Sequence, residues 1–394
     1  MSADARPSLA PWNLHHRSNL AIQPVRRIGR TRPLGLCGLA LVAAPATASA
    51  LDISEKLELN GLIAGAYQCQ QVSGAPDVEN ACRGGLALQP ELSYAPTEAG
   101  RFFVKLGLGL GNGLNNISPF ELAPWAADLE ADVQDINGSG RSYLLEARYA
   151  HTFTFGEGNR IQLAAGIIDP SAFLNTNAYA NDEFTQFSNQ AFVNARNLLL
   201  PAYDWGGALV WEVGDWTFSG VGMSVAENED GAPYNWSGAE VAYHLDSHLG
   251  EGTYRILYSA TSQDFSDESG TGQEPLSGLI LSFDQALGEI VGIFVRAAWQ
   301  LTDGAGTYQS GYEGGCELDG RAWGREADNI GIAYGHAHGG NSEIFQSDVV
   351  EAYYRFAVSD TLALTLDVQW MKDSYRNAED ISGWIPGIRA VAQF

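Results

Sequence analysis

Apolar and polar residues alternate along most of this chain in segments of about ten residues. Residues 101–111 show the pattern, with Phe, Val or Leu at the even positions and Arg101 and Lys105 among the odd ones. In residues 143–149 the same alternation places Leu145 on the apolar face and Glu146 and Arg148 on the polar face. A period of two over this length is typical of a tilted strand with one face to lipid and one to a lumen.

Similar segments recur to the end of the chain, at 86–94, 161–167, 254–258, 291–299, 350–356, 362–370 and 388–394. Short turns, such as those at 156–159 and 214–215, should alternate with long external loops. The long loops are expected near residues 71–85, 112–141, 169–205, 227–235, 263–275, 302–310, 339–347 and 373–383. An even strand count requires a weak strand at 311–320 and a turn at 321–328. We therefore predict an all-β fold, a transmembrane antiparallel β-barrel of about 16 strands.

The first fifty residues have a different character. They contain six Arg, then an apolar run at 34–44, then Ala48-Ser-Ala50. A basic region, a short apolar region and a small-residue cleavage site predict a secretory signal peptide at 1–50, which leaves one barrel domain at 51–394. No other stretch reaches the roughly 18 consecutive apolar residues of a membrane helix, so any crossing must use strands.

Removal of the leader leaves 16 Lys and Arg against 46 Asp and Glu, a formal net charge of −30. This acidity argues against nucleic acid as a partner. Many acidic residues lie in the expected external loops, either as a solvated surface or as a bridge through divalent cations to lipopolysaccharide. The mature histidines form no recognisable catalytic pattern, and His336 and His338 lack a third ligand. We therefore expect no enzyme activity, no bound metal and no cofactor.

The connection at 169–205 differs from the other long loops. It carries six Asn and two Gln among Asp169, Asp182, Glu183 and several aromatic residues. Long loops inside a chain of short strands are commonly functional. We predict that this segment folds into the barrel and lines its narrowest part as a pore-constriction loop.

Eight of the mature basic residues fall on the inward register of strands, which avoids the roughly 2–4 kcal/mol cost of a charge on the lipid face. Two interpretations stay open: the arginines contact a solute, or they form a structural network that holds the loop to the wall. The predicted pore-lining residues are Glu91, Arg101, Lys105, Glu146, Arg148, Asn181, Asp182, Glu183, Arg255, Arg296, Glu351 and Arg355.

Two further patterns concern small residues. Cys69 and Cys82 sit at the two ends of one short loop in an exported chain, so a disulfide between them is a candidate. Cys316 is left over, and we interpret it as a buried small hydrophobe. Gly107, Gly109 and the following glycines lie inside an alternating strand with no helix after it, so we expect them to leave room on the inner face rather than to bind a nucleotide.

Several motifs resemble those of the OprB-type carbohydrate-selective porins. The first and most specific is AYANDE at 178–183, followed by TQF at 185–187 and FVN at 192–194. The others are GRAWGR at 320–325 with DNIG at 328–331, EAYYR at 351–355, LDVQW at 366–370 and GIR at 387–389. The terminal Phe394 on an alternating strand is similar to the signal that bacterial barrel-assembly machinery recognises.

The resemblance implies a sixteen-stranded barrel in the outer membrane of a Gram-negative bacterium, with an external loop folded inward. It further implies passive diffusion of mono- or oligosaccharides through a constriction lined by Arg and acidic residues. The expected partners are outer-membrane lipid, lipopolysaccharide, sugars as transported solutes and, as an open alternative, further copies of the chain. Two other functions stay open: a general or cation-preferring porin, and an adhesin or envelope-anchor barrel.

Overall fold

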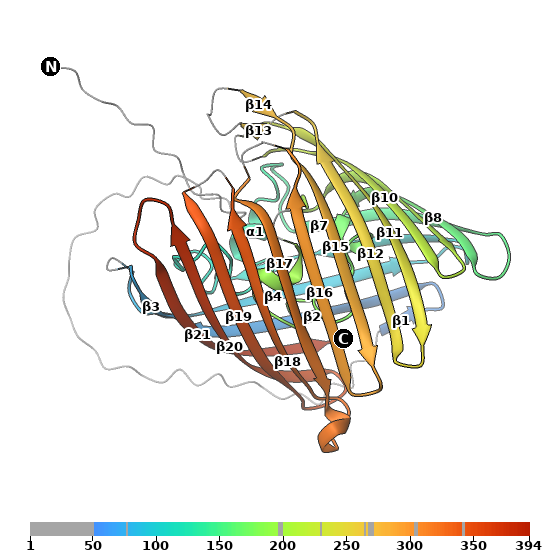
Figure 1. Ribbon diagram of the computed structural model, residues 1–394. Coiled ribbons are helices and arrows are strands. Elements are labelled where there is room, and N and C mark those ends of the chain that lie inside the picture. Colours follow the sequence, from blue (N-terminus) through green and yellow to red (C-terminus); the bar gives the residue numbers. More distant parts are fainter. Residues whose placement is uncertain are drawn as a thin grey trace.

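The structure is a computed structural model, and it describes residues 51–75, 78–195, 200–228, 231–263, 265–266, 272–302, 306–340 and 343–394. The expected signal peptide at 1–50 lies outside the described residues, as does Arg196 of the 169–205 connection. Figure 1 shows strands inclined side by side around an interior that contains short helices, α1 among them. Within the described part of the chain, no helix is long and apolar enough to cross a membrane.

The wall is a closed antiparallel barrel of 16 strands, as predicted. Each strand pairs with the strands before and after it, and the last pairs with the first through Leu62↔Gln393 to Gln68↔Gly387. The strands are β2 (Leu57–Cys69), β4 (Cys82–Tyr94), β5 with β6 (Gly100–Leu106, Leu108–Leu110), β7 (Leu144–Thr154), β8 (Asn159–Ile168), β9 (Asp204–Val213), β10 (Trp216–Val225), β11 (Tyr234–Ser247), β12 (Gly250–Thr261), β15 (Ser277–Leu287), β16 (Val291–Gln300), β17 (Tyr308–Asp319), β18 (Asn329–Gly339), β19 (Ile344–Ala357), β20 (Leu362–Tyr375) and β21 (Ile381–Gln393).

Smaller elements precede the first barrel strand or lie in the connections between strands. They are β1 (Leu51–Ser54), β3 (Gln71–Ser73), β13 (Phe265–Ser266), β14 (Gln273–Glu274), α1 (Glu130–Gln134), η1 (Pro170–Ala172), α2 (Gln190–Val193) and η2 (Gly320–Trp323). The weak strand expected at 311–320 is confirmed as β17, and η2 forms part of the turn that follows it. Without this strand the chain could not return to the side of the barrel on which its C-terminal strand begins.

The alternation of faces is largely confirmed. Phe102, Leu108, Leu163 and Leu366 are exposed on the outer face, where lipid would cover them. The outward placement of Leu145 is wrong: a register shift between Lys105 and Leu106 gives β7 an extra residue there. Leu145 is therefore buried inside the barrel with Val133 and Ile136.

Two outer-face positions also differ from expectation. Cys316 is only half-buried, because it faces outward between Ile293 and Ile332 on the neighbouring strands. Lys372 shares the outer register of Leu366 and Val368, since β20 continues to Tyr375. There it forms an ion pair with Asp380, with 2.9 Å between Nζ and Oδ2.

Two loops fill part of the interior. The 169–203 loop, between β8 and β9, folds inward as predicted, and the 111–143 loop, between β6 and β7, does so as well, although it was expected to lie outside. Glycines on the inner wall make room for both: a Cβ on Gly109 would clash with the Glu130 nitrogen, and one on Gly292 would clash with the Tyr179 ring. These close approaches require residues without side chains.

Candidate functional site

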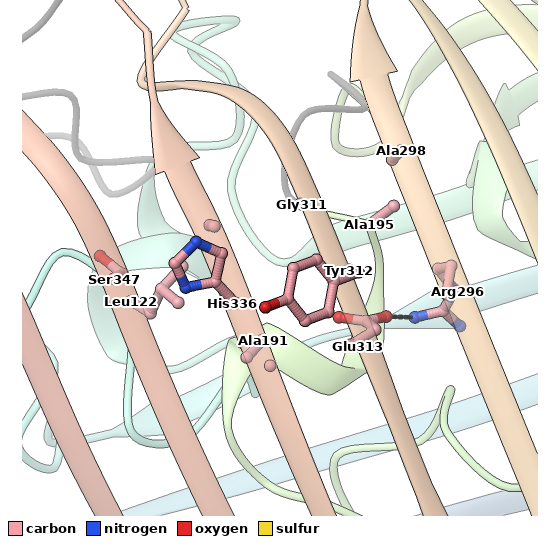
Figure 2. A pocket seen from close by; sticks show the side chains of 12 residues that line it. Leu122, Ala191, Ala195, Arg296, Ala298, Gly311, Tyr312, Glu313, His336 and Ser347 are labelled. Atoms are coloured by element: carbon pink, nitrogen blue, oxygen red, sulfur yellow. Dashed lines mark hydrogen bonds and ion pairs between the residues drawn. The ribbon is translucent and has the colours of Figure 1, made fainter.

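The 169–203 loop crosses the interior along the wall formed by β11 to β21. Near its start, the Asn175 nitrogen donates to Glu240 on β11, with 2.8 Å between nitrogen and oxygen. In its middle, Arg296 of β16 donates to the Ala180 carbonyl at 2.7 Å and is itself paired with Glu313 of β17. Figure 2 shows this ion pair beside Ala191 of the loop. Arg296 is almost fully buried, so its guanidinium group positions the loop.

The loop is fixed most strongly at Ser188 and Asn189. Their two backbone nitrogens donate to the two carboxylate oxygens of Glu351 on β19, at 2.6 and 2.9 Å. Asn189 also caps α2 by accepting a hydrogen bond from the Ala191 nitrogen. Gln369 of β20 adds a contact to Asn189 at 2.8 Å. Ser188 Oγ also donates to Glu351, so three donors of the loop meet on one wall residue and this group is the main anchor of the loop.

A third anchor comes from β21. The guanidinium group of Arg389 donates to the carbonyls of Glu183 and Gln186, both at 2.6 Å. Between these two residues the chain forms a turn, in which Asp182 accepts a hydrogen bond from the Phe184 nitrogen at 2.8 Å. Gln186 in turn accepts one from the Asn181 nitrogen at 2.8 Å. Asn181 and Asp182 therefore shape the turn that presents the Glu183 side chain.

The 111–143 loop is joined to the 169–203 loop. The Ala126 nitrogen donates to the Ser188 carbonyl at 2.9 Å, and the Gln190 nitrogen donates to the Ala123 carbonyl at 3.0 Å. Trp125 is buried between the loops and donates from Nε1 to the Glu183 carbonyl at 3.2 Å. The two loops thus form one folded unit inside the barrel.

Facing this unit, the inner wall of β4, β5 and β7 carries mixed charges. Lys105 lies 3.6 Å from Glu91, measured from Nζ to Oε1, and both side chains are only partly buried. Arg148 pairs with Glu146 on its own strand. The Arg148 guanidinium carbon lies 4.2 Å from the centre of the Phe103 ring and 5.5 Å from that of Phe173 in the loop. Cationic donors and aromatic rings therefore lie side by side on this part of the inner wall.

Carboxylates of both loops face Lys105. Burial and the charge of Asp182 raise the pKa of Glu183 to about 8. Burial and the charge of Asp132 raise the pKa of Asp128 to about 6, although Asp128 accepts a hydrogen bond from the Tyr203 hydroxyl at 2.6 Å. Burial is the main cause of both raised pKa values, and the neighbouring carboxylates add to it more than Lys105 compensates.

The remaining predicted residues lie elsewhere. Arg101 is exposed at the start of β5, and Arg355 donates to the Ala327 carbonyl beside a turn. Arg255 is buried against Asp284. The structure therefore brings Glu91, Lys105, Glu146, Arg148 and Glu183 near one another inside the barrel, whereas Arg296 and Glu351 hold the loop.

Several residues of this region were not foreseen. Asp128 lies in a loop that was expected to be external, and the alternation of β20 indicates only that Gln369 faces inward. The glycines at 107 and 109, which open the wall to that loop, were the available signal. Among the described residues, no group of three His, Cys, Asp or Glu side chains is arranged to hold a metal ion.

Cys69 and Cys82 form a disulfide at the external end of the β2–β4 pair, where they are directly opposite in register. Their bond closes the loop that contains β3, which itself pairs with β21. The disulfide therefore lies at the rim and not at the gap.

Comparison with known proteins gives a consistent result. The sequence profile described as "carbohydrate-selective porin, OprB family" matches residues 127–382. An uncharacterized protein of Aquifex aeolicus (strain VF5) is 28% identical over 300 residues, 74% of this chain and 85% of that protein. The high-pH structure of Pseudomonas putida OprB has a TM-score of 0.66 at 12% identity, covering 86% of this chain and 94% of that one. The outer membrane channel DcaP of Acinetobacter baumannii has a TM-score of 0.56 at 10% identity, covering 86% and 97%.

Proposed function

Because this chain belongs to the OprB family of carbohydrate-selective porins, we propose that sugars cross it through the gap between the two inner loops and the wall of β4, β5 and β7. The protein is a passive carbohydrate channel, and its family and fold are those of channels rather than enzymes. The constriction in this proposal is bordered by Glu91, Lys105, Asp128, Arg148 and Glu183.

The observation that carries this proposal is the combination of groups at the gap. Donors come from Lys105 and Arg148, and acceptors come from the carboxylates that face them. Together these groups can replace the water that hydrates sugar hydroxyls. Phe103 and Phe173 flank Arg148 and offer flat apolar faces to the C–H side of a sugar ring. Passage down the concentration gradient needs no coupled energy, and the hydrogen bonds to the protein lower its barrier because they replace those that the sugar makes to water.

The proposal includes the place of the protein in the cell. A closed porin-type barrel with an apolar outer band fits the outer membrane of a Gram-negative bacterium, and residues 1–50 would serve as the cleaved export signal. Residues 51–394 then form one barrel domain in contact with outer-membrane lipid and lipopolysaccharide. Assembly into a homo-oligomer is compatible with this arrangement.

Liposome swelling tests the function. Purified protein is reconstituted, and the entry of glucose and maltose is compared with that of amino acids of similar size. We expect faster entry of the sugars, and a smaller sugar preference for Lys105→Gln. Lys56→Gln, at a turn outside the barrel lumen, is the matched control. Equal entry of all solutes would indicate a general porin, and no swelling would favour an adhesin or envelope anchor.

A cation-preferring channel is a second candidate. The carboxylates of Glu91, Asp128, Asp182 and Glu183 lie near a gap that has Lys105 and Arg148 as its nearby cations. Such an excess attracts cations at low and moderate ionic strength. Sugar passage and cation preference are compatible, because a neutral sugar is not repelled by either charge.

A further inference from the structure

A separate cavity lies on the other side of the 169–203 loop from the external surface. Its volume is about 580 Å³, and it is lined by inward residues of β7 to β12 close to the short turns. Ala172, Phe173 and Thr176 of the loop cover it. A solute that has passed the gap at Phe173 therefore enters this cavity next, before it leaves on the periplasmic side.

The charged groups of the cavity have partners within the chain. Arg160 forms a two-point contact with Glu212, with 2.8 Å between Nη2 and Oε1. Arg255 is paired with Asp284, and Glu240 accepts a hydrogen bond from the loop at Asn175. The charges of this surface are thus more nearly balanced than those of the constriction, so the cavity suits a neutral ligand.

Uncharged polar side chains of the cavity have unused hydrogen-bonding capacity. Within the described residues, no hydrogen bond of the chain engages the side chains of Thr152, Gln162, Thr176 or Ser219, all of which line the cavity. Ser219 is only 8% exposed, and its side chain lines the cavity. Buried polar groups are ordinarily paired, so the hydroxyl of Ser219 is available to a ligand that brings its own donors and acceptors. The more exposed side chains of Thr152, Gln162 and Thr176 lie on the same surface.

The cavity also has apolar surface beside its uncharged polar side chains. Phe173 forms part of the cavity, together with Val210 and Ala242 on the wall. Hydroxyl and amide groups next to one aromatic face match the two kinds of surface on a pyranose, whose hydroxyls point outward from an apolar ring. The volume falls within the range of roughly 300–1,000 Å³ that is usual for small-molecule sites.

We propose that this cavity is a second carbohydrate subsite, which binds a neutral hexose unit or the leading unit of an oligosaccharide after it leaves the constriction. The proposal rests on the proposed function, since it concerns the path of the same solute. Phe173 belongs to both sites: it stacks near Arg148 on one side and covers the cavity on the other. A sugar can thus keep an aromatic neighbour while it exchanges one set of polar partners for the next.

Protection from thiol labelling tests this proposal. Ser219→Cys is placed in a Cys316→Ser background and modified with a small charged methanethiosulfonate, with and without maltose. At a maltose concentration about ten times the half-protecting one, we expect modification to slow about tenfold. Gln162→Ala should raise the half-protecting concentration about fivefold, since one hydrogen bond to the sugar is removed. Thr152→Cys is a second probe of the same cavity.

Ser259 provides the matched control. It lies on the inner face of β12, away from β4, β5 and β7, and is 4% exposed, but it does not line the cavity. Maltose should leave the labelling of Ser259→Cys unchanged. Equal protection of both cysteines, or of neither, would overturn the subsite. If liposome swelling still shows sugar preference in that case, the proposed channel function stands and only the second subsite is rejected.

Discussion

Protonation of Glu183 changes the charge of the proposed constriction near neutral pH. Its pKa of about 8 and that of Asp128 of about 6 both lie above the usual carboxyl range. As the pH rises through these values, the two groups lose protons and the gap gains negative charge. Cation preference should therefore increase from pH 5 to pH 9, with the largest change between about pH 6 and pH 8.

The substitution Glu183→Gln should remove most of this pH dependence above pH 7. Glutamine has the same shape but no titratable group, and its backbone carbonyl can still accept from Trp125 and Arg389. The measurement is the reversal potential of a planar bilayer in a KCl gradient, at pH 5, 7 and 9. Glu157→Gln, at an exposed turn, is the control and should behave as the native protein. An unchanged pH dependence in Glu183→Gln would show that other groups set the charge of the gap.

The inward orientation of most charged residues could be predicted from the sequence, because a charge that faces lipid is costly. It could not separate the residues at the gap from those that hold the loop. Arg148 and Arg296 have the same register and the same side chain, yet one lies between two aromatic rings and the other beneath Ala180. That difference depends on which segment of the loop passes over each strand, and this is set by tertiary contacts.

Among the elements, the 169–203 loop depends on Glu351 more than on any other wall residue. Two backbone nitrogens converge on its two oxygens, and Ser188 Oγ adds a third donor at 3.1 Å. Glutamine at 351 has only one acceptor oxygen, so its amide group would face a donor. We expect Glu351→Gln to weaken the attachment of the loop by about 1–3 kcal/mol, the usual cost of an unsatisfied buried group.

Hydrogen exchange of the loop amides and single-channel current noise both report on this attachment. Faster exchange at residues 186–193 and a noisier, less sugar-selective channel are expected for Glu351→Gln. Glu317→Gln is the matched control, because its carboxylate binds Tyr353 and Asn329 on the wall and not the loop. Equal effects of the two variants would mean that any reduction of inner-wall charge loosens the loop, whether or not the altered residue binds it.

Among the elements, the strands, the turn at 321–328 and the inward 169–203 loop could be predicted from the sequence, since alternation and loop composition are local properties. The inward course of the 111–143 loop could not. Its Asp128, Glu130, Asp132 and Asp135 are typical of a solvated external segment. The loop is instead held inside by Trp125, Leu129 and Val133, whose burial outweighs the exposure that the acidic residues favour.

At the scale of the whole molecule, the pairing of β21 with β2 closes the barrel and leaves no free strand edge. Phe394 exchanges two backbone hydrogen bonds with Gly61, each 2.9 Å long. A Cβ on Gly61 would come within 2.8 Å of the Phe394 ring, so the two residues are closely fitted. Closure thus brings the last residue of the chain against the first barrel strand.

We expect Phe394→Ala to reduce the fraction of protein that reaches the closed, heat-modifiable form, with a larger effect at high expression. The ratio of folded to unfolded bands in unheated gels of membrane fractions measures this. Phe153→Ala removes an exposed outer-face aromatic of β7 that is remote from the closure, and it is the control. A reduction as large for Phe153→Ala would attribute the effect to weaker packing against lipid and not to closure.

The positions of the residues that hold the 169–203 loop also bear on the order in which the barrel assembles. Glu351, Gln369 and Arg389 belong to β19, β20 and β21, the strands that lead to the closure against β2. Until β19, β20 and β21 are in place, the 169–203 loop lacks the three wall residues that hold it. If this loop forms the proposed constriction, closure of the wall also fixes the part of the channel that selects solutes.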